Sequence, residues 1–382
     1  MVVESGSELT FLECSGCVAR WNADQVASTC GVCGSPLLAR YSLSGRPLEV
    51  ADIVGRPAGQ FRFHEMLPIR DLSEVRSLGE GGTPMITAEG FENVWVKDEA
   101  SNPTGSFKAR GMAVALTKHV EMGLDRFSLP SNGNAALAAA AYASQYGATV
   151  EVAVPDHTPS SLIERIKEFG ATVHEVSGTI SDAAAFIRQR AAEANLFSLA
   201  TMYEPYRVEG KKMMGYEIFW DLGRLPDVIL YPTGGGTGLI GMVKAFDEME
   251  QLGWIGQERP HMVVVQMEGC APIVEAFRHQ RTRALPWSDP EPTSAYGLLV
   301  PATIGDRLIL RGLRQTRGTA VAVPESALAE GVRRLSVATG LSVSPEGGAC
   351  FAAFESLRHS GWLTEDEAVV VFNTGAAENY DR

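Results

Sequence analysis

Short β-branched runs alternate with segments of helical periodicity beyond about residue 78. Apolar runs predict strands at 94–97, 149–155, 172–176, 227–232, 262–266, 319–323 and 368–372. Helices are predicted between them at 135–146, 160–169, 181–194, 239–250 and 325–339. This alternation predicts an α/β protein with mostly parallel sheets covered by helices, in one or two doubly wound domains. Ligands of such folds bind where strands end and helices begin.

Composition and charge exclude several classes of protein. The 382 residues are 45% hydrophobic and 21% charged, which is typical of a folded globular chain of roughly two to three domains. The net charge is −13, and no block of Lys and Arg could follow a nucleic-acid backbone. We expect no membrane association and a cytoplasmic location, because no apolar run approaches the ~18 residues that span a bilayer and the first ten residues are polar.

Four of the six cysteines lie close together near the N-terminus. Cys14, Cys17, Cys30 and Cys33 form two C-x2-C pairs, a spacing typical of a zinc ribbon with one tetrahedral ion. The alternatives are redox dithiols or unpaired cysteines in a degenerate module. We expect apolar side chains to cover the metal, namely Phe11, Val18, Trp21 and Leu37. Cys270 and Cys350 have no partner spacing and are expected in the core.

A glycine-rich loop follows the predicted strand 227–232. It contains Thr233, Gly234, Gly235, Gly236, Thr237 and Gly238, and an apolar helix follows. Backbone N–H groups of such a loop can converge on phosphate oxygens, and the helix dipole favours the negative charge. The loop fits neither the dinucleotide fingerprint nor a Walker A loop. The alternative is a glycine-rich turn without a ligand.

A second segment, 102–112, places Lys108 among small, turn-forming residues before a helix expected from Ala113. A lysine at a helix N-terminus is a candidate for a Schiff base, because the positive potential there lowers its pKa. A solvated surface lysine is the alternative.

These segments together resemble the threonine synthase branch of the fold-type-II pyridoxal-phosphate enzymes. The resemblance runs from about residue 78 to 374 and also includes the motifs 79–84, 131–134 and 204–212. It implies two doubly wound α/β domains, and the cysteine module is similar to that of some members. The implied domains are a zinc-ribbon-like module (1–40), a large cofactor domain (41–111 and 209–382) and a small mobile domain (112–208). The resemblance also implies an active site between the two larger domains, and a homodimer.

The resemblance also implies a role for individual residues. Lys108 would bind pyridoxal 5'-phosphate and then move protons on the substrate. The cofactor phosphate would be held by Gly234, Gly235, Gly236, Thr237 and Gly238. Asn134 would donate to the phenolic oxygen of the cofactor ring, and Thr374 would face its pyridine nitrogen. The alternative for Thr374 is a strand hydroxyl bonded to backbone.

The substrate site implied by the resemblance is less complete than the cofactor site. Ser131, Asn132 and Gly133 would bind the substrate carboxylate, Thr83 lies in the motif 79–84, and Arg207 matches the family's phosphate-binding arginine. Lys211 and Lys212 are close to Arg207 in sequence, and the alternative for all three is a solvated basic turn. Met202 stands where a serine is common, Ala135 where a threonine often follows, and Ala109 where an aspartate is common. The C-terminal segment 375–380 also departs from the usual ending.

Three reactions remain open for the chain. The first is threonine synthesis from phosphohomoserine and water; Arg207 and its basic neighbours favour it. The second is β-elimination, as in a serine or threonine dehydratase, and the third is β-replacement on serine or phosphoserine, as in cysteate or diaminopropionate synthases. Met202 and Ala135 favour the last two. A scaffold or amino-acid sensor without catalysis is disfavoured, because the residues expected to bind the cofactor are all present.

Overall fold

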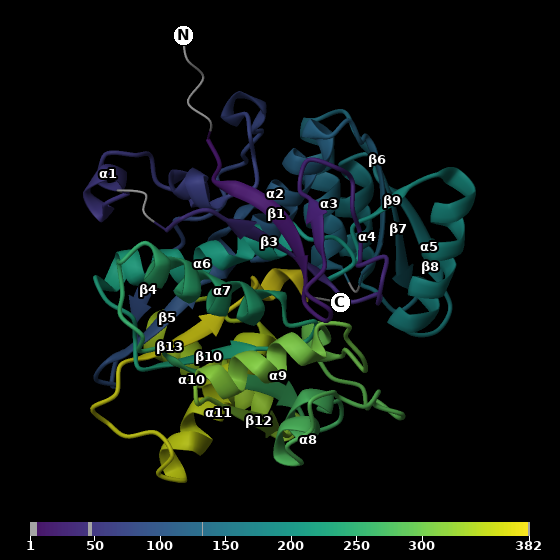
Figure 1. Ribbon diagram of the computed structural model, residues 1–382. Helices are drawn as coiled ribbons and strands as arrows, with labels where there is room; N and C mark the ends of the chain where they lie inside the picture. The colour runs from purple at the N-terminus through teal and green to yellow at the C-terminus, as the bar shows by residue number, and fades with distance from the viewer. Residues whose placement is uncertain (1–5, 45–47, 132, 381–382) are drawn as a thin grey trace. The chain divides into compact units, whose positions relative to one another are not determined.

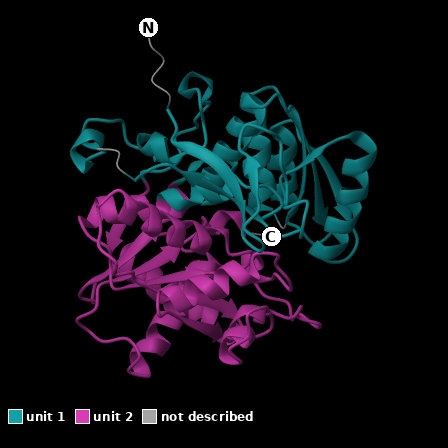
Figure 2. Ribbon diagram, viewed as in Figure 1, with its two compact units in different colours: residues 1–82, 102–213, 381–382 teal, residues 83–101, 214–380 magenta. Residues whose placement is uncertain are grey.

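The chain folds into two compact units, each formed from separate segments. In this computed structural model the described residues are 6–44, 48–131 and 133–380. The first unit contains residues 1–82, 102–213 and 381–382, and the second contains 83–101 and 214–380 (Figure 2). The architecture is the α/β arrangement expected from the sequence. The boundaries of the three expected domains stay a prediction.

The first unit begins with a small antiparallel sheet in the order β2-β1-β3. Its strands β1 and β3 are labelled in Figure 1. Its strands are β1 (Leu9–Cys14), β2 (Arg20–Asn22) and β3 (Leu37–Tyr41). Leu12 pairs with Trp21 on one side and with Ala39 on the other. The connection that follows contains α1 (Val50–Val54) and the 3-10 helices η1 (Gln60–Met66) and η2 (Leu72–Glu74).

A parallel sheet in the order β8-β7-β6-β9 forms the main body of the first unit. Its strands are β6 (Arg126–Pro130), β7 (Thr149–Pro155), β8 (Thr172–Val176) and β9 (Phe197–Ser198). Its helices are η4 (Pro103–Gly105), α2 (Lys108–Glu121), α3 (Asn134–Gln145), α4 (Ser160–Glu168), α5 (Ile180–Ala194) and the start of α6 (Arg207–Leu222). The alanine-rich helix α3 is buried from Ala136 to Ala143. Small side chains let neighbouring elements pack closely against it.

The second unit contains a six-stranded sheet in the order β12-β11-β10-β13-β5-β4, parallel except for β4. Its strands are β4 (Met85–Thr87), β5 (Val94–Asp98), β10 (Val228–Pro232), β11 (His261–Met267), β12 (Thr319–Val323) and β13 (Val369–Asn373). Its α-helices are the end of α6 with α7 (Thr237–Gln251), α8 (Pro272–Arg278), α9 (Asp306–Gln315), α10 (Leu328–Thr339) and α11 (Pro345–His359). The 3-10 helices are η3 (Glu99–Ser101), η5 (Tyr296–Leu298), η6 (Glu325–Ala327) and η7 (Ala377–Asn379).

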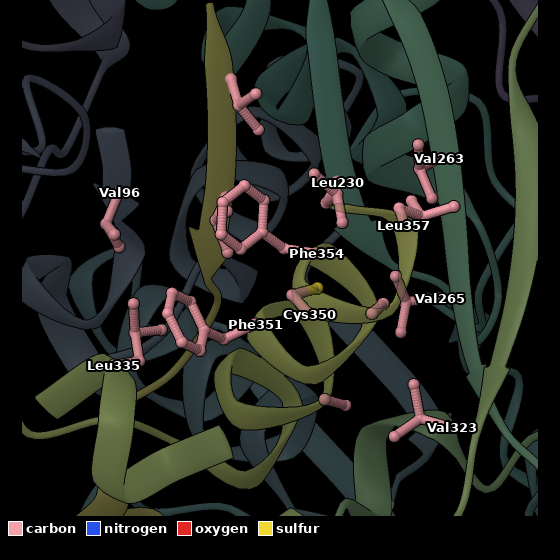
Figure 3. Close-up of a cluster of buried hydrophobic side chains, with 14 of the residues drawn as sticks. Val96, Leu230, Val263, Val265, Val323, Leu335, Cys350, Phe351, Phe354 and Leu357 are labelled. Carbon is pink, nitrogen blue, oxygen red and sulfur yellow. The ribbon is translucent and has the colours of Figure 1, made fainter. Parts of the chain in front are cut away.

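Helix α11 supplies the aromatic part of the core of the second unit. Phe351, Phe354 and Leu357 point from it toward the valines of the sheet, and Leu335 of α10 lies beside Phe351 (Figure 3). The rings of Phe351 and Phe354 are 5.5 Å apart. Each buried side chain of this size contributes about 1.5–3 kcal/mol relative to exposure. The core fixes β10 and β13, the two strands that precede the glycine loop and Thr374.

The observed elements differ from the sequence prediction in a few places. Helix α2 begins at Lys108 and not at Ala113. The helix expected over 325–339 is divided into η6 and α10. In the described part of the chain, we find no helix with the length and apolar character needed to cross a bilayer. Cys270 and Cys350 are fully buried, as expected.

Candidate active site and cysteine cluster

The four N-terminal cysteines converge in the first unit. Their Sγ atoms all lie within 4.8 Å of one another, with 3.4 Å between Cys14 and Cys33 and 3.6 Å between Cys17 and Cys30. These distances exclude disulfides, whose sulfurs are about 2.05 Å apart. Four thiolates at the zinc–sulfur distance of ~2.3 Å form a tetrahedron with edges of about 3.8 Å. The geometry therefore fits one structural zinc ion and leaves no position for a substrate.

Local contacts favour a thiolate in this cluster. The Ser35 hydroxyl and backbone N–H lower the pKa of Cys33 to about 6. A metal binds thiolates and not thiols. Trp21 packs over Gly31, where a Cβ would lie 3.0 Å from the indole ring. The expectation that Val18 covers the metal is wrong, because this residue is 72% exposed; its φ of 53° is left-handed.

Lys108 lies at the start of α2, where η4 and Phe107 precede the helix. The side chain is half-buried, and its Nζ is 4.4 Å from the centre of the Phe107 ring. The role of Lys108, as a Schiff-base lysine or as a solvated surface lysine, stays a prediction. The N–H groups of a first helical turn have no intrahelical acceptor and give this end of α2 a positive potential.

Two glycines bring α6 against α2 in the first unit. A Cβ at Gly210 would lie 1.9 Å from the carbonyl oxygen of Arg110, and a Cβ at Gly111 would lie 2.8 Å from that of Arg207. Only glycine permits this approach of two helix backbones. The crossing places the first turn of α6 beside the first turn of α2, which carries Lys108.

The basic residues of α6 are buried, so the alternative of a solvated basic turn is wrong. Arg207 is 2% exposed, and Lys211 and Lys212 are fully buried. Lys212 is neutralised by Glu209, at 2.6 Å, and the Tyr41 hydroxyl donates to the same carboxylate. Lys211 has another environment: burial, then the charges of Arg207 and Lys108, lower its pKa far below the ordinary value.

Arg207 is held at the start of α6 by its neighbours. Glu204 accepts hydrogen bonds from the backbone N–H groups of Tyr206 and Arg207, both at 2.8 Å. The Arg207 Nη1 donates to the carbonyl of Leu199 at 2.5 Å. Its buried Nε has no hydrogen-bond partner among the described residues. A buried donor without an acceptor lowers the stability of the folded state by about 1–3 kcal/mol, and a bound anion would remove this loss.

The loop between β6 and α3 carries the residues that the resemblance places at the substrate carboxylate. The Ser131 Oγ accepts hydrogen bonds from the N–H groups of Gly133, at 3.0 Å, and Ala136, at 3.1 Å. Among the described residues the Ser131 hydroxyl proton has no acceptor, while the Gly133 N–H is already engaged. Asn134 begins α3 and is half-buried. The expected substrate residue Asn132 lies outside the described residues.

The glycine loop of the second unit joins β10 to α7, as its sequence predicts. Thr233 is anchored to β11, since its N–H donates to Val265 and its carbonyl accepts from Gln266. Gly236 has a φ of 78°, and a Cβ there would lie 2.2 Å from the Ile309 side chain. Helix α7 starts at Thr237, so the N–H groups of Thr237 and Gly238 stand in its first turn. This end of the helix has the donors and the dipole that a phosphate requires.

Two further predicted residues lie at strand ends of the second unit. Thr374 follows β13 directly and is 4% exposed. The strand end is fixed by Asn373, whose amide donates to Asp98 at 2.9 Å. Thr83 is also buried, and its hydroxyl donates to Glu99 at 2.7 Å. Lys108, Asn134, Ser131 and Arg207 thus belong to the first unit, and the glycine loop, Thr83 and Thr374 belong to the second.

Sequence reasoning missed the contributions of Glu204 and Gly210. Glu204 caps α6 three residues before Arg207, and acidic residues are favoured at helix N-termini, so the signal was present. Gly210 stands in the first turn of α6, and within a helix glycine is disfavoured by about 1 kcal/mol relative to alanine. Such a glycine is a sign of close packing.

Comparison with known proteins finds a family match and relatives that cover most of the chain. Residues 76–375 match the family described as pyridoxal-phosphate dependent enzyme. The threonine synthase of Methanocaldococcus jannaschii is 31% identical over 376 residues, which cover 95% of this chain and 91% of that protein. The threonine synthase of Methanosarcina acetivorans is 30% identical over 372 residues, with the same coverages.

Solved structures share the fold at lower identity. A threonine deaminase from T.th. superposes with a TM-score of 0.65 and 24% identity, covering 77% of this chain and 92% of that chain. An L-serine ammonia-lyase from Rhizomucor miehei has a TM-score of 0.65 and 20% identity, covering 78% and 96%. At these identities the likeness establishes the fold alone.

Proposed function

We propose that this chain, which belongs to the pyridoxal-phosphate-dependent enzyme family, is a lyase of the threonine synthase type. It would convert O-phospho-L-homoserine and water to L-threonine and phosphate. The observation that carries the proposal is Arg207, a buried guanidinium whose Nε lacks a partner within the described residues. It lies on the helix packed against the start of α2, where Lys108 stands. A substrate that carries its own phosphate, in addition to the phosphate of the cofactor, needs such a donor.

The cofactor residues fit pyridoxal 5'-phosphate by their chemistry. The loop from Gly234 to Gly238 would hold the phosphate at the α7 N-terminus, and Lys108 would form the covalent bond. Asn134 would donate to the phenolic oxygen, and the neutral Thr374 would face the ring nitrogen. When bound, the cofactor withdraws electrons from the substrate α carbon, and a neutral partner at the nitrogen moderates that effect.

The substrate residues would divide the work of binding and proton transfer. Ser131 would donate its hydroxyl proton to the substrate carboxylate, and Arg207 would bind the substrate phosphate. The Lys108 amine would take the α proton and then a β proton, so that phosphate departs from the γ carbon with its bridging oxygen. Water would then add its hydroxyl at the β carbon; the two protons taken by Lys108 and the one given up by water would go to the γ carbon, the α carbon and the departed phosphate. Thr83, whose hydroxyl is bonded to Glu99, would contribute to the rim of the substrate site.

Met202 favours a second candidate, elimination or replacement on a smaller substrate. Its side chain is 2% exposed, with a left-handed φ of 65°. An apolar group there offers no donor to a phosphate, and neither does Ala135 beside Asn134. A serine or threonine dehydratase, or a β-replacement enzyme acting on serine or phosphoserine, has no need of a donor for a γ-phosphate.

A four-substrate assay tests the proposal. The holoenzyme is offered phosphohomoserine, phosphoserine, threonine and serine, and phosphate, 2-oxo acid and amino-acid products are measured together. We expect phosphate and threonine from phosphohomoserine alone. Lys108→Ala is the matched inactive variant, and Lys167→Ala, at an exposed lysine of α4, is the control that keeps activity. Keto acid from serine or threonine would favour a dehydratase, and turnover of phosphoserine only with an added nucleophile would favour replacement.

The structural metal is proposed separately from the catalytic function. Elemental analysis of the purified chain is expected to find about one zinc ion per chain. Two results together would contradict a structural metal. The purified chain would contain no zinc, and the variant with Cys14 and Cys17 both replaced by serine would fold normally.

A further inference from the structure

The cysteine module contacts the segment that leads into α6, far along the chain. The Ser28 Oγ donates a hydrogen bond to the carbonyl of Tyr203 at 2.5 Å. The Tyr206 hydroxyl donates to the carbonyl of Ala23 at 2.8 Å. Ala23 and Tyr206 are fully buried. Both contacts lie within the first unit, so the loop between the two cysteine pairs is bonded directly to the residues before Arg207.

Neither side of this contact has regular secondary structure of its own. Residues 23–28 and 199–206 contain no helix or strand. Met202 also has a left-handed φ of 65°, which is unfavourable for a residue with a Cβ. Such a conformation persists when the surrounding structure holds it. The hydrogen bonds at Tyr203 and Tyr206, which follow Met202 closely, are contacts that can hold this segment in place.

Tyr206 contacts α2 as well as the cysteine module. Its ring is 5.4 Å from the ring of His119 on α2. The Nε2 of His119 is 3.4 Å from the carboxylate of Glu204. That carboxylate accepts hydrogen bonds from the backbone N–H groups of Tyr206 and Arg207. Two neighbours, α2 and the Ala23 carbonyl, therefore hold the start of α6, and loss of the module would remove one of them.

A metal in the cysteine cluster would fix the loop that makes these contacts. Cys17 and Cys30 flank the loop 18–29, and their sulfurs are 3.6 Å apart. One ion bound to both sulfurs closes the loop and restricts its conformations. A site of this kind is rarely formed before its metal binds. The places of Ala23 and Ser28 within the loop therefore depend on the metal.

We propose that a metal ion in the cysteine cluster orders the start of α6, with Ser28 and Tyr206 as the positioning residues that connect the two. With the metal bound, both hydrogen bonds form and hold the segment 203–207. Without it, the loop 18–29 moves, both bonds are lost and the segment relaxes. The inference goes beyond the proposed reaction and rests on the proposed structural metal. The module, which has no position for a substrate, thus still positions Arg207.

Hydrogen–deuterium exchange of the full-length holoenzyme, read by mass spectrometry, tests the proposal without any assay of activity. The zinc-bound protein is compared with the same protein after a chelator has removed the zinc. We expect the backbone amides of residues 203–209 to exchange about tenfold faster without zinc, because two hydrogen bonds that hold them are lost. The amides of residues 136–143 in α3, which belong to the same unit, should change less than about twofold.

A double variant separates the contact from the metal itself. Ser28→Ala with Tyr206→Phe removes only two hydroxyls and keeps all four cysteines, so it should contain as much zinc as the unmodified chain. With zinc bound, its amides at 203–209 should already exchange about tenfold faster, and removal of zinc should add less than about twofold. Tyr146→Phe is the matched control, since it removes a hydroxyl that contacts Thr117 at 2.6 Å in the same unit. It should keep the zinc dependence of the unmodified chain.

Kinetics with phosphohomoserine show whether the ordered segment positions Arg207 for the substrate. In the double variant KM should rise about tenfold while kcat changes less than about twofold, because the disorder reaches Arg207 and not the lysine that moves protons. A fall in kcat at constant KM would overturn the positioning role.

Three results of the exchange measurement would overturn the proposal. They are unchanged exchange at 203–209 after zinc removal, an equal increase in α3, and a double variant that keeps the full zinc dependence. A purified chain without zinc would overturn it together with the structural metal. The proposed reaction fails by a different result, namely zinc-dependent exchange at 203–209 in a protein that forms no threonine from phosphohomoserine.

Discussion

The crossing of α2 and α6 gives the sharpest prediction about the architecture of the site. In Gly210→Ala the added Cβ would lie 1.9 Å from the Arg110 carbonyl oxygen and 2.6 Å from its carbon. Ordinary contact begins at 3.4 Å, so the two backbones must separate by roughly 1.5 Å. A backbone carbonyl cannot rotate away as a side chain can. The substitution therefore has to displace one helix.

Two opposing effects set the size of the change in stability. Alanine is favoured over glycine inside a helix by about 1 kcal/mol. Overpacking costs about 1–3 kcal/mol and more when the backbone must move. The clash should outweigh the gain in helix propensity and lower the free energy of unfolding by about 2 kcal/mol. For a unit of this size the melting temperature should fall by about 4–8 °C. Displacement of Lys108 relative to Arg207 by about 1 Å should also reduce kcat/KM about a hundredfold.

The assay compares thermal melting and phosphate release for Gly210→Ala and Gly256→Ala. A Cβ at Gly256 would meet nothing within 4 Å, so that variant should match the unmodified chain within about 0.5 kcal/mol. The reasoning would be refuted by a Gly210→Ala protein that melts within about 2 °C of the unmodified chain and keeps its activity.

Three other perturbations have expected results. Cys14→Ser should lower the zinc content measured by elemental analysis and weaken the cysteine module, since one of four ligands is lost. Lys212→Met should lower the free energy of unfolding by about 3–5 kcal/mol in urea denaturation, because Glu209 is left charged, buried and without its cation. Arg190 lowers the pKa of Glu151, so this pair should stabilise the fold above pH ~4.5 and lose that effect as the pH falls through the lowered pKa. In Glu151→Gln the melting temperature should fall less steeply as the pH is lowered. An unchanged fall would contradict a stabilising role of the Arg190–Glu151 pair.

The sequence alone predicts the elements whose signals are local. The strands 149–155, 172–176 and 319–323 appear with the expected bounds, because their β-branched runs end at polar or turn-forming residues. The glycine loop and the helix after it are also where the pattern placed them. Strand β6 was not predicted, because its composition is mixed and its residues do not alternate between polar and apolar. Strands that are buried in a parallel sheet often lack this alternation.

The basic run on α6 shows what local reasoning could not predict. Arg207, Lys211 and Lys212 have the composition of a surface turn, but Gly111, about a hundred residues earlier, allows α6 to pack there and buries them. That contact depends on tertiary structure alone. Val18 is the opposite case: an apolar residue beside a cysteine was expected to cover the metal, but it is exposed and has a left-handed φ.

The central claim, loss of phosphate from the γ carbon followed by addition of water at the β carbon, is tested most directly by an isotope measurement. The holoenzyme is supplied with phosphohomoserine in water enriched in oxygen-18, and both products are analysed by mass spectrometry. The account predicts threonine with one labelled hydroxyl oxygen and phosphate without label, in equal amounts. Labelled phosphate with homoserine, or 2-oxo acid in place of threonine, would contradict it.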